Sequence, residues 1–258
     1  MMKTLLVERK EAIAIIHLQR PSCLNAVNTL MLDELQQKFE QLQADETVKG
    51  ILLTGTEGHF AAGVDLQEIR HFTPLEAISF AESGQQLCSL IENFPRPVLA
   101  AVSGYALGAG LELALACDYI LADKTAQFGF RELCYGVLPA FGGTQRLPRL
   151  IGKARAKELL FTGNVVSAEE ALHIGLVNQL FPQESLLDDV LQQLQKICSY
   201  GLLSLQMGKE VIDTGYDINL PAACKMERDA FAVCFSTDDQ KEGMGAFIEK
   251  RKPSFTGK

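Results

Sequence analysis

The chain has 258 residues, of which 47% are hydrophobic and 22% are charged, as is typical of a globular protein with one large core. Its net charge of −8 and isoelectric point of about 5.1 argue against binding to a nucleic-acid backbone, because phosphates attract cations. No uncharged apolar stretch reaches the roughly 20 residues of a membrane span, and no signal-peptide pattern opens the chain. We therefore expect neither a nucleic-acid partner nor a membrane.

Cysteine and histidine usage gives no sign of a metal centre. The seven cysteines are an odd number without a C-x-x-C pair, which favours free thiols in a reducing cytoplasm over disulfides or a zinc site. The four histidines are scattered along the chain, and we expect them to be structural or surface residues. P-loop, dinucleotide-binding, nucleophile-elbow and zinc-protease motifs are also missing from the sequence. We therefore do not expect the nucleotide-binding, serine-hydrolase or zinc-protease chemistry that these motifs serve.

Before Lys153, strand-like and helix-like segments alternate along the chain. The expected elements are strands at 5–7 and 13–18, a helix capped by Asn28, a strand at 48–55, a helix beginning near Asp65, a helix over 76–94 and a strand at 97–104. That last strand, PVLAAVSG, is continuously apolar, as expected for a strand buried on both faces. A strand, a glycine turn, a helix and a strand then recur up to residue 123. The alternation predicts an α/β core with right-handed crossovers.

From Lys153 onward, helices dominate the expected structure. The sequence SAEE at Ser167–Glu170 predicts a capping box, and Gly175 is expected just after the end of that helix. Further helices are expected at 202–214, 220–236 and 239–251. We therefore predict an α/β core over residues 1–198 and a C-terminal helical region over 199–258 that docks on the core or on another subunit.

Three segments combine small residues with a carboxylate or a turn, and each follows a predicted strand: His59–Leu66, Gly104–Asp118 and Phe128–Gly152. Ligands of open α/β sheets sit beyond the carboxyl ends of strands. Gly63 and Gly108–Gly110 allow backbone N–H groups to approach a ligand closely, and two such groups aimed at one point form an oxyanion hole. The same glycines would also suit tight turns and close helix packing, so the residues alone leave both interpretations open.

Two glutamates are the candidate acid and base. Glu112 lies within the apolar run GYALGAGLELALACDYI, where an isolated buried charge costs several kcal/mol unless it is paired, hydrated or protonated. Either Glu112 reaches the surface or a site needs it. Glu132 follows a second strand and glycine turn, and two carboxylates in one poorly solvated pocket would titrate as a coupled acid–base pair. A surface salt bridge with Arg131 or a nearby lysine is the alternative for Glu132.

Taken together, these segments resemble the enoyl-CoA hydratase/isomerase (crotonase) family. RPSCLNAV is similar to the family's R-P-x-x-x-N-A segment, HFAAGVDL to its F-x-A-G-x-D-[LI] loop and PVLAAVSGYALGAGLELALACD to its signature, and the similarity spans nearly the whole chain. The resemblance implies an α/β, crotonase-like spiral of ββα units with a C-terminal helical trimerisation region, assembled as a homotrimer or a hexamer of two trimers. It also implies an acyl-CoA thioester substrate, as in fatty-acid metabolism, and no cofactor beyond the coenzyme A of that substrate.

The resemblance also assigns roles to individual residues. By position, the backbone N–H groups of Val64 and Ala109 form the oxyanion hole, Glu112 activates a water molecule and Glu132 delivers a proton to C2 of the substrate. The implied substrate-binding residues are Ala62, Gly63, Asp65, Leu66, Gly108, Pro139 and Ala140. The implied reaction is that of a lyase, the reversible syn addition of water to a trans-2-enoyl-CoA to give a 3-hydroxyacyl-CoA.

Some positions depart from the family pattern. Where hydratases often read P-G-A-G-G, this chain reads PAFGG, so Ala140 replaces a glycine whose N–H helps to hold the water, and Phe141 adds bulk near the acyl or water pocket. Gln67 stands where many relatives carry a lysine near the CoA adenine. Arg20 and the cations of Lys250–Lys252 are candidates to compensate for that loss, although for the C-terminal cations a solvated surface is an equal alternative.

Other activities remain open at this point. A Δ3–Δ2 enoyl-CoA isomerase needs only the carboxylate at Glu132, and the presence of Glu112 speaks against it. A specialised hydroxyacyl-CoA dehydratase would run the same chemistry backwards, and an acyl-CoA hydrolase would release a free thiol. A non-catalytic oligomeric binding protein is an alternative from another class, which the presence of both glutamates disfavours. The acyl pocket is expected within the segment 66–94, and the acyl chain length is left open.

Overall fold

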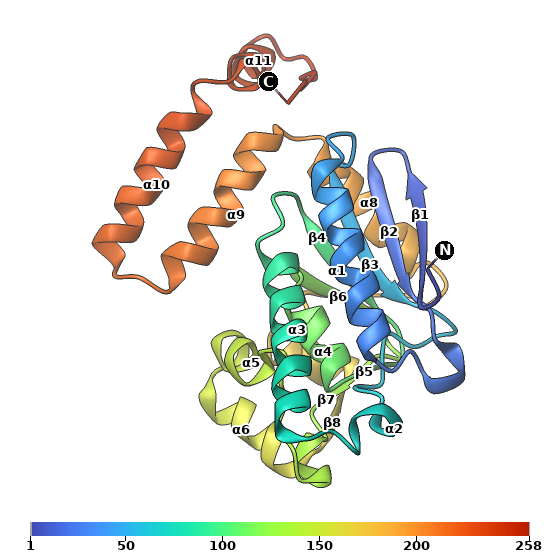
Figure 1. The fold of residues 1–258 in the computed structure, drawn as a ribbon. Helices are drawn as coiled ribbons and strands as arrows, with labels where there is room; N and C mark the ends of the chain where they lie inside the picture. The colour runs from blue at the N-terminus through green and yellow to red at the C-terminus, as the bar shows by residue number, and fades with distance from the viewer. Residues whose placement is uncertain (1, 258) are drawn as a thin grey trace. The chain divides into compact units, whose positions relative to one another are not determined.

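A computed structural model describes residues 2–257, which form two compact units (Figure 1). The first unit comprises residues 2–94 and 98–192, and the second comprises residues 95–97 and 193–257. The division that we predicted after residue 198 falls at the end of helix α8 (Leu186–Cys198), whereas the two units divide inside that helix, between Gln192 and Gln193.

A six-stranded sheet forms the centre of the first unit. Its strands lie in the order β1 (Leu5–Lys10), β2 (Ile13–Leu18), β3 (Gly50–Gly55), β4 (Val98–Val102), β6 (Tyr119–Asp123) and β9 (Gln179–Phe181). The β1–β2 pair is an antiparallel hairpin, and all the other pairs are parallel. Every residue of β4 is buried, which confirms the prediction made from its unbroken apolar run.

A small second sheet contains β5 (Tyr105–Leu107), β7 (Gln127–Gly129) and β8 (Val165–Ser167). The chain twice passes from a strand of the large sheet to a strand of the small sheet and then to a helix. The first round is β4, β5 and α4 (Ala109–Leu115), and the second is β6, β7 and, after a 3-10 turn at Glu132–Tyr135, α5 (Gly143–Ile151). This repeating order is the ββα spiral that we expected.

The remaining helices of the first unit begin at polar side-chain caps, except for the helix that follows Gly152, which has no side-chain cap. They are α1 (Thr29–Ala44), α2 (Leu66–Ile69), α3 (Pro74–Glu92), α6 (Lys153–Thr162) and α7 (Ala168–His173). Asn28 caps α1 as predicted, since its side-chain oxygen accepts the Met31 N–H at 3.0 Å. Helix α3 begins earlier than predicted because Thr73 and Glu76 form a capping box just before the apolar stripe starts.

The capping box predicted for α7 is only half formed. The Ser167 hydroxyl accepts the Glu170 N–H at 3.2 Å, as predicted. The Glu170 carboxylate instead lies 3.4 Å from the guanidinium of Arg155, so the return bond of a full box is not found within residues 2–257. Gly175 follows the end of α7 with φ +79, in the left-handed conformation that its predicted position requires.

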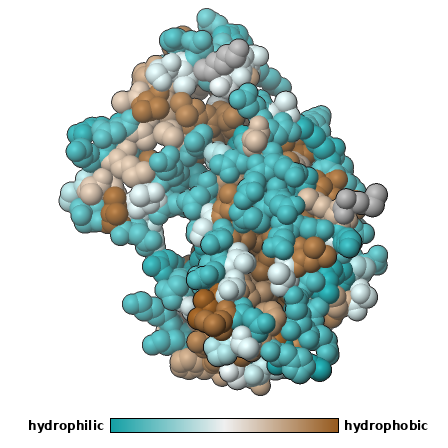
Figure 2. Space-filling view, viewed as in Figure 1, coloured by the Kyte–Doolittle hydropathy of each residue, from teal (hydrophilic) through white to brown (hydrophobic). Residues whose placement is uncertain are grey.

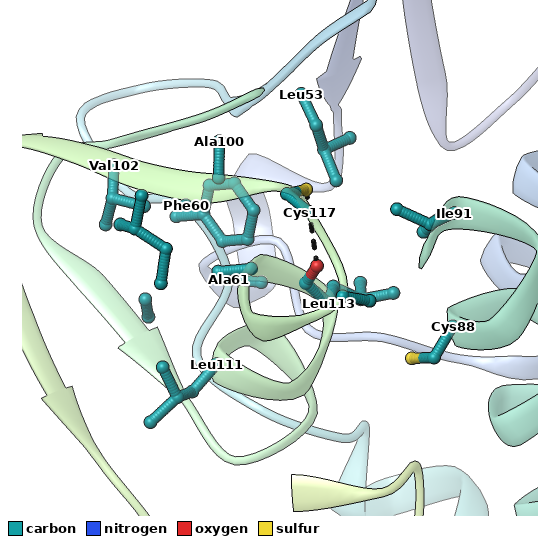
Figure 3. Close-up of a cluster of buried hydrophobic side chains, with 14 of the residues drawn as sticks. Leu53, Phe60, Ala61, Cys88, Ile91, Ala100, Val102, Leu111, Leu113 and Cys117 are labelled. Atoms are coloured by element: carbon teal, nitrogen blue, oxygen red, sulfur yellow. Dashed lines mark hydrogen bonds between the residues drawn. The ribbon is translucent and has the colours of Figure 1, made fainter. Parts of the chain in front are cut away.

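Helix α4 packs into the middle of the first unit's core. Figure 3 shows Leu111 and Leu113 of this helix among buried side chains of β4 and α3, with the Cys117 thiol donating to the Leu113 carbonyl at 3.5 Å. Gly110 makes this approach possible, because a Cβ at its position would lie 2.2 Å from the Ala61 carbonyl oxygen. The helix that carries Glu112 is therefore fixed on several sides by the core.

The second unit is helical beyond residue 200, as predicted. Helices α9 (Leu202–Tyr216) and α10 (Leu220–Cys234) form a hairpin, and α11 (Asp238–Ile248) follows (Figure 1). Buried Asp239 accepts the backbone N–H groups of Thr256 at 2.7 Å and Gly257 at 2.9 Å, which folds the C-terminal tail back onto α11. Apolar surface is visible on these helices (Figure 2), and their largely exposed apolar residues are Ile212, Tyr216, Leu220, Phe231, Phe247 and Ile248.

Over residues 2–257, none of the helices combines the length and the apolar character needed to cross a membrane.

Candidate active site

The pairing of β5 with β7 brings together the two segments that carry the glutamates, helix α4 and the 3-10 turn at Glu132–Tyr135. These strands are parallel, with Leu107 opposite Gly129, so the segments that follow both residues leave the sheet at the same end. The Gly108 N–H donates to the Gly129 carbonyl at 2.9 Å and ties the two exits to each other. For Glu112 and Glu132 to converge on one site, the segments that carry them must leave the small sheet at the same end, as they do here.

Glu112 is buried in the first unit, with only 2% of its surface exposed. Its Oε1 accepts two backbone hydrogen bonds, from the Phe141 N–H at 2.8 Å and the Gly143 N–H at 2.7 Å. Both bonds end on Oε1, so these amides orient the carboxylate without engaging Oε2. The alternative in which Glu112 reaches the surface is therefore wrong.

Glu132 is also buried, with 8% of its surface exposed. Its Oε1 lies against the Gly108 turn, where an added Cβ would come within 2.2 Å of that oxygen, and the φ of +49 at Gly108 disfavours any side chain. Its Oε2 has no hydrogen-bond partner among residues 2–257. Within residues 2–257, Glu132 forms no salt bridge with the exposed Arg131, which was the alternative.

Burial raises the pKa values of both carboxyls. Burial raises the pKa of the Glu112 carboxyl to about 7, even though the Gly143 and Phe141 amides act in the opposite direction, and the nearby Glu132 charge raises it further. Burial likewise raises the pKa of Glu132. A carboxyl with a pKa of about 7, as at Glu112, can take up and release a proton near neutral pH.

Two backbone amides next to this pair are unpaired. The loop after β3 runs along β5, with the Ala61 N–H donating to Tyr105 O at 2.8 Å and the Leu107 N–H donating to Ala61 O at 3.0 Å. The N–H groups of Val64 in this loop and of Ala109 at the start of α4 donate to no residue within 2–257. Amides at helix starts lack intrahelical acceptors, and free donors on adjoining loops are what an oxyanion hole needs.

A cavity of about 140 Å³ collects many of the predicted residues. Its lining is Ala62, Gly63, Val64, Leu66, Leu107, Gly108, Arg131, Glu132, Tyr135 and Val137. Glu112 and Ala109 are buried in α4 and are not among the lining residues. The predicted oxyanion loop and Glu132 thus share one cavity of the first unit.

Three predicted substrate-binding residues lie outside this cavity. The Asp65 carboxylate is engaged by Arg20 at 2.8 Å and also caps α2. Pro139 lines a separate cavity of about 430 Å³ between α5 and α6. The Ala140 carbonyl accepts from the Gln85 side chain at 2.9 Å. Their assignment as substrate-binding residues stays a prediction.

Sequence reasoning missed the turn that holds Glu112. The amides of Phe141 and Gly143 had no motif of their own, although the double glycine before α5 marked a backbone free to approach another group. Of the segment 66–94, in which we expected the acyl pocket, only Leu66 lines the 140 Å³ cavity. The Phe80 ring instead packs on Phe141, with ring centroids 5.3 Å apart.

Within residues 2–257, no group of three or more His, Cys, Asp or Glu side chains is placed to hold a metal ion.

Comparison with known proteins defines the class to which this fold and site belong. The pattern of the family described as enoyl-CoA hydratase/isomerase matches residues 8–258, and the chain belongs to that family. The crotonyl-CoA hydratase of Syntrophomonas wolfei is 41% identical over 257 residues, covering 99% of each chain. The short-chain-enoyl-CoA hydratase of Clostridium acetobutylicum is 38% identical over 252 residues, covering 97% of each.

A solved structure agrees with these relatives. The crystal structure of an enoyl-CoA hydratase from Bacillus anthracis superposes with a TM-score of 0.96 at 35% identity, covering 99% of this chain and 100% of that one. The predicted crotonase-like fold is therefore confirmed.

Proposed function

We propose that this chain hydrates trans-2-enoyl-CoA thioesters to 3-hydroxyacyl-CoA by a two-glutamate mechanism. Membership of the enoyl-CoA hydratase/isomerase family and relatives named as enoyl-CoA hydratases support the activity. The observation that carries the mechanism is local: two buried glutamates with raised pKa values lie beside two unpaired backbone amides. The names of the two relatives favour a short acyl chain.

The proposed reaction begins with polarisation of the substrate. The thioester oxygen accepts hydrogen bonds from the Val64 and Ala109 amides, which stabilise the negative charge that develops on it. Glu112 takes a proton from a water molecule as the water oxygen attacks C3. Glu132, protonated at the start, delivers its proton to C2. The sum is the addition of H and OH across one double bond, and the step needs no cofactor other than the CoA of the substrate.

The proposal extends to assembly and location. A homotrimer, or a hexamer of two trimers, would cover the exposed apolar residues of α9, α10 and α11, of which Phe247 is 85% exposed. Light scattering should then give a mass about three or six times that of the 28.3 kDa chain, and a monomer would contradict this part. The seven free cysteines support a cytoplasmic location.

The activity is tested by the loss of ultraviolet absorbance when the conjugated double bond of crotonyl-CoA is hydrated. We expect turnover by the wild type, and a loss of roughly 10²- to 10⁴-fold in kcat for Glu112→Gln and for Glu132→Gln, because each removes a proton-transfer group. Glu158→Gln, an exposed glutamate on α6, serves as the matched control and should keep full activity.

Two further assays separate this reaction from its alternatives. A 3-enoyl-CoA reports isomerisation, and a thiol reagent reports hydrolysis of the thioester. If the wild type leaves both short and long trans-2-enoyl-CoA unchanged but acts in either of these assays, the hydratase assignment is wrong.

A further inference from the structure

A single turn stands between the Glu112 carboxylate and the guanidinium of Arg146. On one side of this turn, the Phe141 and Gly143 N–H groups donate to Glu112 Oε1. On the other side, Arg146 Nη1 donates to the Phe141 carbonyl at 3.0 Å. Phe141 therefore has its N–H bonded to Glu112 and its C=O bonded to Arg146.

Arg146 is itself fixed by a two-point ion pair. Its Nε donates to Glu92 Oε1 at 3.1 Å, and its Nη2 donates to Glu92 Oε2 at 2.7 Å. Glu92 is the last residue of α3, and the Arg146 side chain is only 16% exposed. A planar guanidinium that bonds both oxygens of a carboxylate has a defined orientation as well as a strong contact. The turn is thus tied to the end of a long core helix.

The Arg146 guanidinium occupies the space where a side chain at Gly142 would lie. A Cβ at Gly142 would lie 2.3 Å from Arg146 Nη1, and the φ of +106 at Gly142 is in the region that favours glycine. The guanidinium therefore lies directly against the backbone of the turn. Arg146 is not placed to touch a substrate in the 140 Å³ cavity, whose lining does not include it.

We propose that Arg146, held by Glu92, is a positioning residue that fixes the 140–143 turn and thereby orients Glu112 toward the reacting water. This inference deepens the proposed function and rests on it for its kinetic consequences. Loss of the guanidinium frees the Phe141 carbonyl, and the turn is then free to carry its two amides away from Oε1. A buried carboxylate without these donors has no fixed orientation.

The kinetic test compares Arg146→Gln with wild type on crotonyl-CoA. We expect kcat to fall by roughly 10- to 100-fold while KM changes less than about threefold, because a displaced catalytic group costs rate more than binding. Arg146→Lys keeps the charge but not the two-point contact, so it should recover only part of the loss. Arg149→Gln, an exposed arginine on the same helix, is the matched control and should resemble the wild type.

A double variant separates positioning from a general structural effect. If Arg146 acts through Glu112, then adding Arg146→Gln to Glu112→Gln should cost little more than Glu112→Gln alone, less than about threefold. If the two losses multiply in full, or if Arg146→Gln keeps the wild-type kcat, the proposal is overturned.

A readout without substrate keeps this proposal separate from the proposed function. In a crystal structure of Arg146→Gln, we expect at least one of the two amide bonds to Glu112 Oε1 to be lost, whereas Arg149→Gln should retain both. Retention of both bonds in Arg146→Gln overturns the proposal. If the wild type proves inactive on enoyl-CoA thioesters, the proposed function fails, and this structural comparison still decides the role of Arg146.

Discussion

At the scale of single residues, the site consists of groups whose burial would be unfavourable without specific partners. Glu112 is 2% exposed in an apolar helix and relies on two backbone amides, while Glu132 is 8% exposed and has one oxygen without a partner among residues 2–257. An unsatisfied buried oxygen costs free energy, so its retention in a folded protein calls for a ligand or a proton. In the proposed mechanism, a water molecule shared with Glu112 would meet that need.

The pKa values predict how the rate depends on pH. Burial raises the pKa of Glu112 to about 7, and in the proposed role this group must be ionised to accept a proton from water. The hydration rate should therefore fall as the pH drops below about 7. At high pH it should fall again when the last proton of the pair is lost. A profile of kcat/KM for crotonyl-CoA checks this, and a rate that keeps rising below pH 6 would contradict the assignment.

Gly108 gives a second prediction at this scale. A Cβ at this position would lie 2.2 Å from Glu132 Oε1 and would also strain a backbone with φ +49. Gly108→Ala should therefore displace the Glu132 carboxylate and lower kcat by an amount comparable to Glu132→Gln, roughly 10²-fold or more. Gly136→Ala is the control, since Gly136 also has a positive φ but an added Cβ there would meet no atom of residues 2–257 within 4 Å. Equal activities of the two variants would contradict the claim that Gly108 leaves room for the Glu132 carboxylate.

At the scale of elements, helix α3 shows how the departure from the family pattern at Phe141 is accommodated. Gly84 lies in the middle of α3, where a glycine costs about 1 kcal/mol relative to alanine. A Cβ at Gly84 would lie 2.0 Å from the ring of buried Phe141, so the absence of a side chain in α3 makes room for that ring. The ring in turn anchors the residue whose N–H holds Glu112.

This complementarity predicts a rescue. Gly84→Ala should destabilise the protein by roughly 1–3 kcal/mol through overpacking, despite the better helix propensity of alanine. Combining it with Phe141→Ala should make Gly84→Ala less harmful than it is in the wild-type background. Urea unfolding of the four proteins measures both effects. Simple additivity of the two changes would show that Gly84 and Phe141 do not share this space.

The elements that the sequence predicted well are those with local signals. The Asn28 cap, the apolar run of β4 and the glycine after α7 each act within a few residues, and the structure confirms all three. The three-residue strands β8 and β9 were missed because pairing with distant strands, and not their own short patterns, makes them strands. The capping box at Ser167–Glu170 was half right, because Arg155 competes for the glutamate side chain.

The same distinction applies to the site. Glu112 stood out because a carboxylate in an apolar run is unusual, and Glu132 because it follows a second strand and glycine turn. The resemblance to a family supplied their roles. The ion pair of Arg146 with Glu92 could not be predicted from the sequence, because its two residues belong to different helices that come together only in the folded chain. Backbone donors such as the Gly143 N–H also give no signal in the sequence, since every residue except proline carries one.

At the scale of the whole molecule, a raised carboxyl pKa is also a statement about stability. The folded protein binds a proton at Glu112 more tightly than the unfolded chain does, because the pKa rises from an ordinary 4.5 to about 7. Between these pH values, the contribution of Glu112 to the free energy of unfolding therefore decreases as the pH rises, and above about pH 7 the full cost is present. The buried Glu112 carboxylate thus lowers the free energy of unfolding while it provides a group that can exchange protons.

Glu112→Gln tests this cost directly, because glutamine keeps an oxygen to accept the two amides but carries no charge. At pH 8 the variant should be more stable than the wild type by up to roughly 3 kcal/mol, and at pH 4.5 the difference should be much smaller. Urea unfolding at both pH values and one fixed protein concentration measures it. A variant that is less stable than the wild type at pH 8 would contradict the burial account.

The central claim, the division of labour between the two glutamates, is tested most directly by hydrogen exchange at C2 of a saturated thioester. Butyryl-CoA in D₂O cannot be hydrated, so exchange of its C2 proton, followed by NMR, isolates the step assigned to Glu132 and the oxyanion hole. We expect exchange by the wild type, exchange within about tenfold of it by Glu112→Gln, and a loss of roughly 10²-fold or more in Glu132→Gln. Exchange that survives in Glu132→Gln but is lost in Glu112→Gln would show that the two roles are reversed.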